Sequence, residues 1–419
     1  MNAVLPVREA ERSRISSAPG RARRWATRMG NLRPSAIREI LKVAESASVI
    51  SFAGGLPAPE LFPTAALAEA AARILTDDGA AALQYSTTEG YAPLRHWIAQ
   101  DLIDSTALAA SPDRILVTHG SQQGLDLVAK VFLDPHDVVL VENPAYLGAL
   151  QAFRSYEAQV VGIPSDDHGL RPDALRRALA RATRLPKFLY LIPNFQNPTG
   201  VSLGGARRLE IAGIAAEYGL TVVEDDPYGR LRFTGTHTPA LCSAQVLPSW
   251  VYLGTISKIL APGLRVGWAV SSDAALHEKL VIAKQAADLH TSTFCQRLAT
   301  DFLQTPGSLD KQVERLSAVY GWRRDAMLAA LENHLPEGCS WTHPEGGLFL
   351  WVRLPESIDT VELLRRSMQD HVAFVPGEPF WVGNPVRNTL RLNYSHSSEE
   401  TIAEGIARLG KSIRSVLTP

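Results

Sequence analysis

Between residues 114 and 270, short apolar runs rich in β-branched and aromatic residues alternate with longer segments of helical periodicity. The alternation predicts strands at residues 114–118, 138–142, 160–164, 188–192, 221–224, 250–254 and 265–270. Helices are predicted between them, among others at residues 122–132, 172–181 and 205–218. Because the strands are apolar along almost their whole length, we expect helices on both faces of the sheet. The pattern is typical of an α/β domain with a mostly parallel sheet.

The pattern changes after residue 270. Two long helical stretches, at residues 273–304 and 309–334, lead into a β-rich segment at residues 340–354 that contains the turn Glu345-Gly346-Gly347. A further strand is predicted at residues 389–393 and a closing helix at residues 399–416. We expect these elements to form a second, smaller α+β domain.

The chain has 419 residues, which exceeds what one ordinary hydrophobic core organises. We predict an arginine-rich arm at residues 1–30, a small domain from residues 31–60 and 306–419, and a large domain at residues 61–305. The arm is compatible with a transit peptide, a solvated segment or a segment that packs on a partner subunit, although Glu9 and Glu11 disfavour the transit peptide. No Gly/Ser-rich linker separates the domains, so we expect them to pack together.

The charges nearly cancel, with 42 basic and 43 acidic residues. This balance argues against nucleic acid or an anionic membrane as a partner and favours a small-molecule ligand. The three cysteines are scattered, which fits neither a disulfide framework nor a metal site and favours the cytoplasm. No apolar run reaches the ~18 residues of a membrane-spanning helix, and the first residues lack the apolar core of a secretory signal.

Lys258 is the first candidate for chemistry. It follows a predicted strand, with the hydroxyls of Thr255 and Ser257 shortly before it and Arg265 seven residues after it. A lysine amine forms a Schiff base with a carbonyl cofactor, and desolvation or a nearby cation lowers its pKa. The hydroxyls and Arg265 are suited to a phosphate group. The alternative is a surface lysine after a core strand.

The segment Gly120-Ser121-Gln122 lies between a predicted strand and a predicted helix. Backbone N–H groups at a helix N-terminus favour an anion such as phosphate. The alternative for this segment is an ordinary helix start with Ser121 as its N-cap.

Two further polar runs follow predicted strands. Asp225 and Asp226 end one strand, with Tyr228 close behind, where a carboxylate can meet a protonated ring nitrogen. Asn197 follows another strand and precedes a proline, which favours an extended backbone and a well-held side-chain amide. The alternatives are solvated or helix-capping acids and an ordinary Asn-Pro turn.

Together these runs resemble class I/II pyridoxal-phosphate aminotransferases. The runs that carry the resemblance are Gly120-Ser121-Gln122, Asn197-Pro198-Thr199-Gly200, Asp225-Asp226-Pro227-Tyr228, Ser257-Lys258 with Arg265, and Leu390-Arg391-Leu392-Asn393-Tyr394. Asn197 and Asp225 are 28 residues apart, and Asp225 and Lys258 are 33 residues apart, as in that family. The resemblance begins near Ser35. The run at residues 51–63, with Leu83-Gln84-Tyr85-Ser86, is similar to the 2-aminoadipate and kynurenine-type branch.

The resemblance implies an aspartate-aminotransferase-like fold and pyridoxal 5'-phosphate as cofactor. Lys258 would hold the cofactor as a Schiff base and move the substrate proton, while Asp225 would keep the ring nitrogen protonated. Asn197 and Tyr228 would hydrogen-bond the ring hydroxyl oxygen, and Tyr146 would stack on the ring unless it is simply a core aromatic. The residues assigned to cofactor binding are Gly120, Ser121, Gln122, Tyr146, Asn197, Asp225, Tyr228, Thr255, Ser257, Lys258, Arg265 and, from a neighbouring subunit of a homodimer, Tyr85.

The resemblance also assigns substrate contacts. Arg391 would clamp the α-carboxylate, a task for a planar bidentate donor, with Asn197 and Gly55 beside it. Arg38 either meets a distal carboxylate or is a solvated helix residue. The expected donors are glutamate, 2-aminoadipate, aromatic or branched amino acids, with a 2-oxo acid as acceptor. The alternatives are a β-lyase or decarboxylase using the same cofactor, and a ligand-sensing regulator. No metal is expected.

Overall fold

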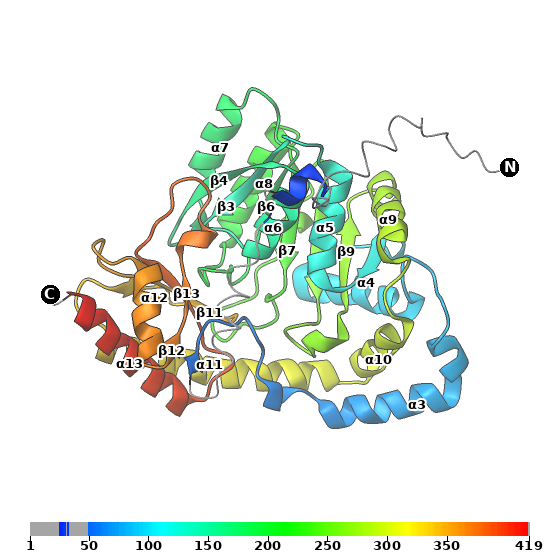
Figure 1. The fold of residues 1–419 in the computed structure, drawn as a ribbon. Helices are drawn as coiled ribbons and strands as arrows, with labels where there is room; N and C mark the ends of the chain where they lie inside the picture. The colour runs from blue at the N-terminus through cyan, green and yellow to red at the C-terminus, as the bar shows by residue number, and fades with distance from the viewer. Residues whose placement is uncertain (1–24, 31, 33–48, 418–419) are drawn as a thin grey trace, which may run out of the picture. The chain divides into compact units, whose positions relative to one another are not determined.

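The computed structural model describes residues 25–30, 32 and 49–417 (Figure 1). Contacts divide the chain into two units, residues 1–33 and residues 34–419. The described part of the first unit contains one short 3₁₀ helix, Thr27–Gly30. Since residues 34–419 form a single compact unit by contacts, the division into a large and a small domain stays a prediction.

An eight-stranded sheet organises the second unit, in the order β2-β9-β8-β7-β6-β3-β4-β5. The strands are β2 (Ile115–Thr118), β3 (Val138–Asn143), β4 (Gln159–Asp166), β5 (Gly169–Leu170), β6 (Phe188–Leu191), β7 (Thr221–Asp226), β8 (Trp250–Thr255) and β9 (Gly267–Ser271). Strands β4, β3, β6, β7 and β8 pair in parallel, whereas β9 runs antiparallel to β8 and β2. The mostly parallel sheet expected from the sequence is confirmed.

Helices cover this sheet, and Figure 1 shows α5 and α6 side by side over the strands. The helices in this part of the chain are α3 (Thr64–Ala82), α4 (Ala92–Thr106), α5 (Gly120–Phe132), α6 (Leu147–Ser155), α7 (Pro172–Arg181), α8 (Gly205–Glu217), α9 (Ala274–Asp288) and α10 (Thr293–Gln304). Of these, α3 packs mainly against α10. The single helical stretch predicted at residues 273–304 is wrong. Leu289 has a left-handed φ of 65°, which ends α9, and the Ser292 side chain accepts a hydrogen bond from the Cys295 N–H to cap α10.

The C-terminal part contains a four-stranded antiparallel sheet in the order β10-β11-β14-β13. Its strands are β10 (Ser340–Trp341), β11 (Phe349–Arg353), β13 (Val375–Pro376) and β14 (Thr389–Asn393). A parallel pair joins β1 (Ile50–Ser51) to β12 (Val372–Ala373). The helices of this part are α11 (Ser308–His334), α12 (Thr360–Gln369) and α13 (Glu399–Leu417). The smaller α+β arrangement expected after residue 270 is therefore present.

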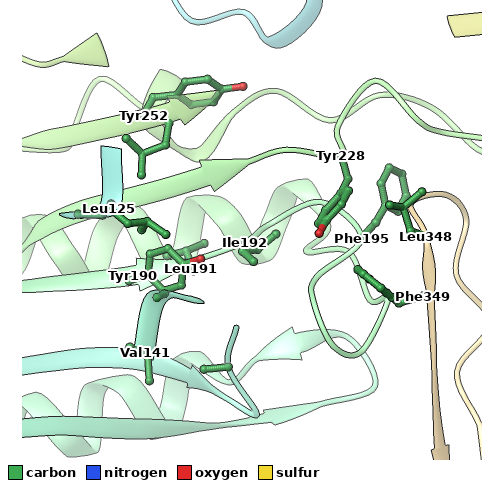
Figure 2. Packing of buried hydrophobic residues seen from close by; sticks show 14 of the residues in the cluster. Leu125, Val141, Tyr190, Leu191, Ile192, Phe195, Tyr228, Tyr252, Leu348 and Phe349 are labelled. Atoms are coloured by element: carbon green, nitrogen blue, oxygen red, sulfur yellow. The ribbon is translucent and has the colours of Figure 1, made fainter. Parts of the chain in front are cut away.

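One apolar core runs from the main sheet to strand β11. Figure 2 shows Tyr228, which follows β7, facing Phe349 of β11. Their ring centroids are 5.9 Å apart with the planes at 89°, an edge-to-face arrangement that aromatic quadrupoles favour. The main sheet and the smaller sheet thus meet through aromatic packing. None of the described helices combines the length and the apolarity that crossing a bilayer requires.

The predicted turn Glu345-Gly346-Gly347 lies where the two sheets meet. The Gly347 N–H donates a 2.8 Å hydrogen bond to the Leu231 carbonyl, and a Cβ at Gly346 would lie 2.2 Å from the same oxygen. Only glycine allows this approach, because any side chain would overlap the backbone. The turn brings β11 close to the loop that follows β7.

Candidate active site

A cavity of about 1170 Å³ lies at the carboxyl ends of β6, β7 and β8. This is the edge of a parallel sheet at which α/β proteins bind ligands. The predicted site residues that line it are Gly55, Ser121, Gln122, Tyr146, Asn197, Asp225, Tyr228, Thr255, Ser257, Lys258, Arg265 and Arg391. Residues more than 300 positions apart in the chain therefore meet in one cavity.

Lys258 lies in this cavity, just past the end of β8. Its Nζ donates a 2.9 Å hydrogen bond to the Gly55 carbonyl. Burial, together with the positive charges of Arg265 and Arg391, lowers the pKa of Lys258 to about 8. An amine with this pKa is partly neutral near neutral pH, which is the form that attacks a carbonyl group.

Asp225 lies within the same cavity and is almost fully buried. The Tyr190 hydroxyl donates a 2.9 Å hydrogen bond to Oδ2 of Asp225. Oδ1 is buried and has no hydrogen-bond partner among the residues that the structure describes. Burial raises the pKa of Asp225 to about 7. Leaving a buried acceptor without a donor costs free energy, so Oδ1 of Asp225 is suited to a ligand that brings an N–H group.

Asp226, the neighbour of Asp225, has a different environment. Its Oδ1 accepts hydrogen bonds from Asn194 Nδ2 at 3.0 Å and from the Gly229 N–H at 2.9 Å, and its Oδ2 accepts one from the Tyr252 hydroxyl at 3.0 Å. Successive side chains of a strand point to opposite faces, which separates the two carboxylates. Asp226 thus binds Asn194, Gly229 and Tyr252 of neighbouring segments, while Asp225 lines the cavity.

Arg391, Asn197 and Tyr228 form a connected row of polar groups. Nη1 of Arg391 donates a 2.9 Å hydrogen bond to Oδ1 of Asn197, and Nδ2 of Asn197 lies 3.5 Å from the Tyr228 hydroxyl. The guanidinium carbon of Arg391 lies 4.2 Å from the centre of the Phe349 ring. Burial lowers the pKa of Arg391 to about 10, so the side chain keeps its charge at neutral pH. The row can bind a carboxylate at one end and a ring oxygen at the other.

The N-terminal turn of α5 and the segment between β8 and β9 form an anion-binding cradle, which consists of Ser121, Gln122, Ser257 and Arg265. The first backbone N–H groups of a helix have no intrahelical acceptor, and the helix dipole favours negative charge there. Arg265 lies against this turn, since its Nη2 donates a 3.1 Å hydrogen bond to the His119 carbonyl. The cradle can hold a phosphate group by charge and by directed donors.

The details of the cradle correct one prediction. Ser121 is not the N-cap of α5, because the helix begins at Gly120 and His119 occupies the N-cap position. The Ser121 hydroxyl is therefore not required to cap the helix. Gly120 itself is not among the cavity-lining residues; it has a φ of 70°, and a Cβ there would lie 2.8 Å from Nη2 of Arg265. Gly120 thus makes room for the guanidinium.

Thr255 and Tyr146 border the cradle. Oγ1 of Thr255 lies 2.8 Å from the Ser257 hydroxyl and donates a 2.9 Å hydrogen bond to the Val266 carbonyl, so Thr255 orients Ser257. The Tyr146 hydroxyl donates a 3.3 Å hydrogen bond to Oε1 of Gln122, and burial raises the pKa of Tyr146 to about 12. Tyr146 therefore stays neutral and presents its ring to the cavity.

With this geometry in place, comparison with known proteins decides the family. A model of the family aminotransferase class I and II matches residues 48–409. The chain belongs to this family. It is 45% identical over 386 residues to aromatic-amino-acid aminotransferase 1 of Thermococcus litoralis, a match that covers 91% of this chain and 92% of the relative. It is 46% identical over 391 residues to 2-aminoadipate transaminase of Thermus thermophilus, covering 93% and 96%.

The solved structures give the same result. An alpha-aminoadipate aminotransferase from Thermus thermophilus, complexed with N-(5'-phosphopyridoxyl)-L-leucine, is similar with a TM-score of 0.87 at 45% identity. The match covers 94% of this chain and 98% of that chain. The family, the fold and the enzyme class expected from the sequence are confirmed.

Besides Gly120, one predicted residue that the structure describes does not line the cavity of this aminotransferase. Tyr85 is 78% exposed, and its ring meets His290 edge-on at a centroid distance of 5.8 Å, outside the cavity of its own chain. Arg38 lies outside the described residues. Their roles stay predictions.

Sequence reasoning missed Tyr190 and Phe349. Tyr190 is a lone hydroxyl in the buried strand Phe188–Leu191, and a buried tyrosine hydroxyl nearly always needs a polar partner. That requirement was a usable signal for Tyr190. The sequence held no such signal for Phe349, because nothing in the neighbouring residues distinguishes an aromatic residue that packs against Arg391 from any other core aromatic residue.

Proposed function

We propose that this aminotransferase uses pyridoxal 5'-phosphate to move an amino group from an L-amino acid to a 2-oxo acid. The observation that carries the proposal is the buried Oδ1 of Asp225, which has no hydrogen-bond partner among the described residues and belongs to the same cavity as the amine of Lys258. The protonated ring nitrogen of the cofactor would supply the N–H group that this oxygen lacks. When bound, the cofactor supplies an electron sink for the charge left when the Cα–H bond of the substrate breaks.

The donor set of the cavity fits the rest of the cofactor. The anion-binding cradle would hold its phosphate, and the Lys258 amine would bond to its carbonyl carbon. Asn197 and Tyr228 would hydrogen-bond the ring oxygen. Tyr146 would cover one face of the ring, because its own ring lines the cavity next to Gln122. Each of these groups on the cofactor thus has a matching residue.

In the reaction, Arg391 would bind the α-carboxylate of the substrate with its planar guanidinium. Asn197 keeps Arg391 in place, which orients the substrate and its Cα–H bond. The substrate amine would replace the Lys258 amine on the cofactor, and the freed Lys258 would take the proton from Cα and hold it on Nζ for the next transfer. Asp225 would remain ionised because it faces a cation on the ring nitrogen.

For the substrate, we propose amino donors from a set that includes glutamate, 2-aminoadipate, aromatic and branched amino acids. The names of two similar proteins, an aromatic-amino-acid aminotransferase and a 2-aminoadipate transaminase, support this range. The leucine adduct of the similar solved structure supports an apolar side chain as well. Arg38 would select for a distal carboxylate.

We also propose a homodimer in which Tyr85 reaches the cofactor phosphate of the neighbouring subunit. Its 78% exposure supports this role, since it leaves the side chain accessible to a second subunit. Light scattering of the purified protein tests the dimer. The cysteines are free thiols, which supports our proposal of a cytoplasmic setting.

The test of the proposed function is a donor panel. The protein, loaded with pyridoxal phosphate, is mixed with 2-oxoglutarate and each proposed donor apart from glutamate, because glutamate and 2-oxoglutarate only exchange with each other. We expect glutamate and the 2-oxo acid of the donor to appear in equal amounts. Release of pyruvate and ammonia would instead support a β-lyase, and release of carbon dioxide a decarboxylase. No 2-oxo acid from any donor would exclude transamination.

A further inference from the structure

A partly buried polar network borders the anion-binding cradle, and two of its members, His119 and Gln123, also line the cavity. We name it the α5–α9 network, and it consists of His119, Gln123, Lys284 and Asp288. The side chains of Lys284 and Asp288 come from the last turns of α9, and Gln123 comes from the first turns of α5. Lys284 is fully buried, with 0% of its surface exposed.

The hydrogen bonds of this network converge on Gln123. Nζ of Lys284 donates to Oε1 of Gln123 at 3.0 Å and to both carboxylate oxygens of Asp288 at 2.7 and 2.8 Å. Nε2 of Gln123 donates to Oδ2 of Asp288 at 2.7 Å. The Asp288 carboxylate also lies 2.7 Å from Nδ1 of His119. Both polar ends of the Gln123 side chain are thus fixed by charged groups.

Gln123 in turn fixes the backbone at the start of α5. The His119 N–H donates a 2.8 Å hydrogen bond to Oε1 of Gln123, while the His119 carbonyl accepts from Nη2 of Arg265 at 3.1 Å. The His119 residue is therefore bound at both of its backbone polar groups. Its orientation determines where the following N–H groups of the cradle point, because Gly120 and Ser121 follow directly in the helix.

The energetics argue that the network has more than a packing role. A fully buried lysine costs free energy even when paired, and an apolar pair of the same volume is often as stable. Desolvation lowers the pKa of Lys284, and its partner Asp288 opposes that shift. The ion pair between Lys284 and Asp288 costs free energy of folding, and keeping Gln123 aligned for the cradle would account for its presence.

We propose that Gln123, held by Lys284 and Asp288, is a positioning residue for the phosphate of the cofactor. The proposal rests on the proposed function, since it assumes that the cradle binds that phosphate. It predicts that disturbing Gln123 weakens binding of the phosphate group and leaves binding of the pyridine ring unchanged. A packing role would weaken both equally.

The experiment compares two probes that form no bond to Lys258, pyridoxamine phosphate and pyridoxamine. Their dissociation constants are measured with the cofactor-free protein by calorimetry. In Gln123→Met, which keeps the side-chain volume and removes both hydrogen-bonding ends, we expect pyridoxamine phosphate to bind about five- to tenfold more weakly, the equivalent of one hydrogen bond. Pyridoxamine should change by less than about twofold, within the range of a neutral substitution.

Gln312→Met is the matched control. Gln312 is a buried glutamine of α11 whose Nε2 donates a 2.9 Å hydrogen bond to the Leu61 carbonyl, and it does not line the cavity. We expect both probes to bind this variant as they bind the wild type. Asp288→Asn provides a second variant if Gln123→Met does not fold, with the same expected selectivity for the phosphorylated probe.

Equal weakening of the two probes in Gln123→Met, or no weakening of either, would overturn the proposal. The same phosphate-selective loss in Gln312→Met would overturn it too. If the wild-type protein bound no pyridoxamine phosphate at all, the proposed function would fail and this proposal with it. If the wild type bound pyridoxamine phosphate tightly and Gln123→Met weakened both probes equally, only the positioning role of Gln123 would be refuted.

Discussion

The Arg391 guanidinium and the Asn197 amide are joined by a 2.9 Å hydrogen bond between residues 194 positions apart in the chain. A second guanidinium nitrogen, Nη2, donates to the Ala53 carbonyl at 2.7 Å, whereas Nε is buried without a partner among the described residues. The side chain is therefore held in one orientation before any substrate arrives. Such preorganisation lowers the entropic cost of binding a carboxylate.

Arg391→Lys tests whether the planar geometry matters as well as the charge. Lysine keeps the charge but loses the fork that binds Asn197 and a carboxylate together, so kcat/KM for every amino donor should fall about 100-fold through the loss of charged hydrogen bonds. Steady-state kinetics with two donors measure this. Arg177→Lys is the control, because Arg177 is an exposed residue paired with Asp173 and should leave kcat/KM unchanged. Equal activity of Arg391→Lys and the wild type would contradict the assigned clamp.

The lowered pKa of Lys258 predicts how its reactivity depends on pH. Burial and the nearby arginines disfavour the ammonium form, so Lys258 is mostly charged below pH 8 and mostly neutral above it. In the cofactor-free protein, acetylation of Lys258 by acetic anhydride should therefore reach half its maximal rate at about pH 8. A solvated lysine would do so only near its ordinary pKa of about 10.4.

Mass spectrometry of the peptide that carries Lys258 measures this titration. Lys258→Ala is the control, because it removes the labelled site and should also reduce transamination at least about a thousandfold through loss of the general base. A midpoint above pH 10 would show that the amine is not desolvated in solution.

Tyr190→Phe tests the hydrogen bond that supports Asp225. The Tyr190 hydroxyl lowers the pKa of Asp225, so its removal should raise that pKa above the present value of about 7. A carboxyl group that is more often protonated at pH 7 accepts the ring N–H less well. We expect pyridoxamine phosphate to bind about fivefold more weakly at pH 7, the equivalent of one hydrogen bond, with the loss disappearing as pH rises.

The control for this prediction is Tyr252→Phe. Tyr252 donates a 3.0 Å hydrogen bond to Asp226, the neighbouring carboxylate outside the cavity. Its removal should leave the pH dependence of binding as it is in the wild type. A loss in Tyr190→Phe that stayed constant with pH would point to packing instead of the ionisation of Asp225.

Gly346→Ala tests the contact between the two sheets. The added methyl group would lie 2.2 Å from the Leu231 carbonyl oxygen and 2.5 Å from the Phe195 ring, so the turn must shift. We expect a loss of about 1 to 3 kcal/mol in the free energy of unfolding, the usual cost of overpacking, and a lower Tm in thermal denaturation. Gly213→Ala is the matched control, because a Cβ at Gly213 meets nothing within 4 Å. Its position inside α8 should make that change neutral or slightly stabilising.

Local patterns of apolar and polar residues were enough to predict much of the fold. The strands that end at Thr118, Asp226 and Thr255 were predicted within one or two residues of their observed ends, because a buried strand is apolar along its whole length. The break between α9 and α10 was missed, since the left-handed φ of Leu289 is not a preference of leucine and arises from its surroundings.

By itself, the sequence determined which polar residues follow which strands, and hence that Lys258, Asp225 and Asn197 would meet at one edge of a sheet. Parallel strands impose that meeting, because their carboxyl ends share an edge. Only the tertiary structure decided which groups pair across long separations, such as Tyr190 with Asp225, Arg391 with Asn197 and Gln123 with Lys284. These pairs depend on how helices and sheets pack, and no local spacing in the chain records side-chain contacts of that kind.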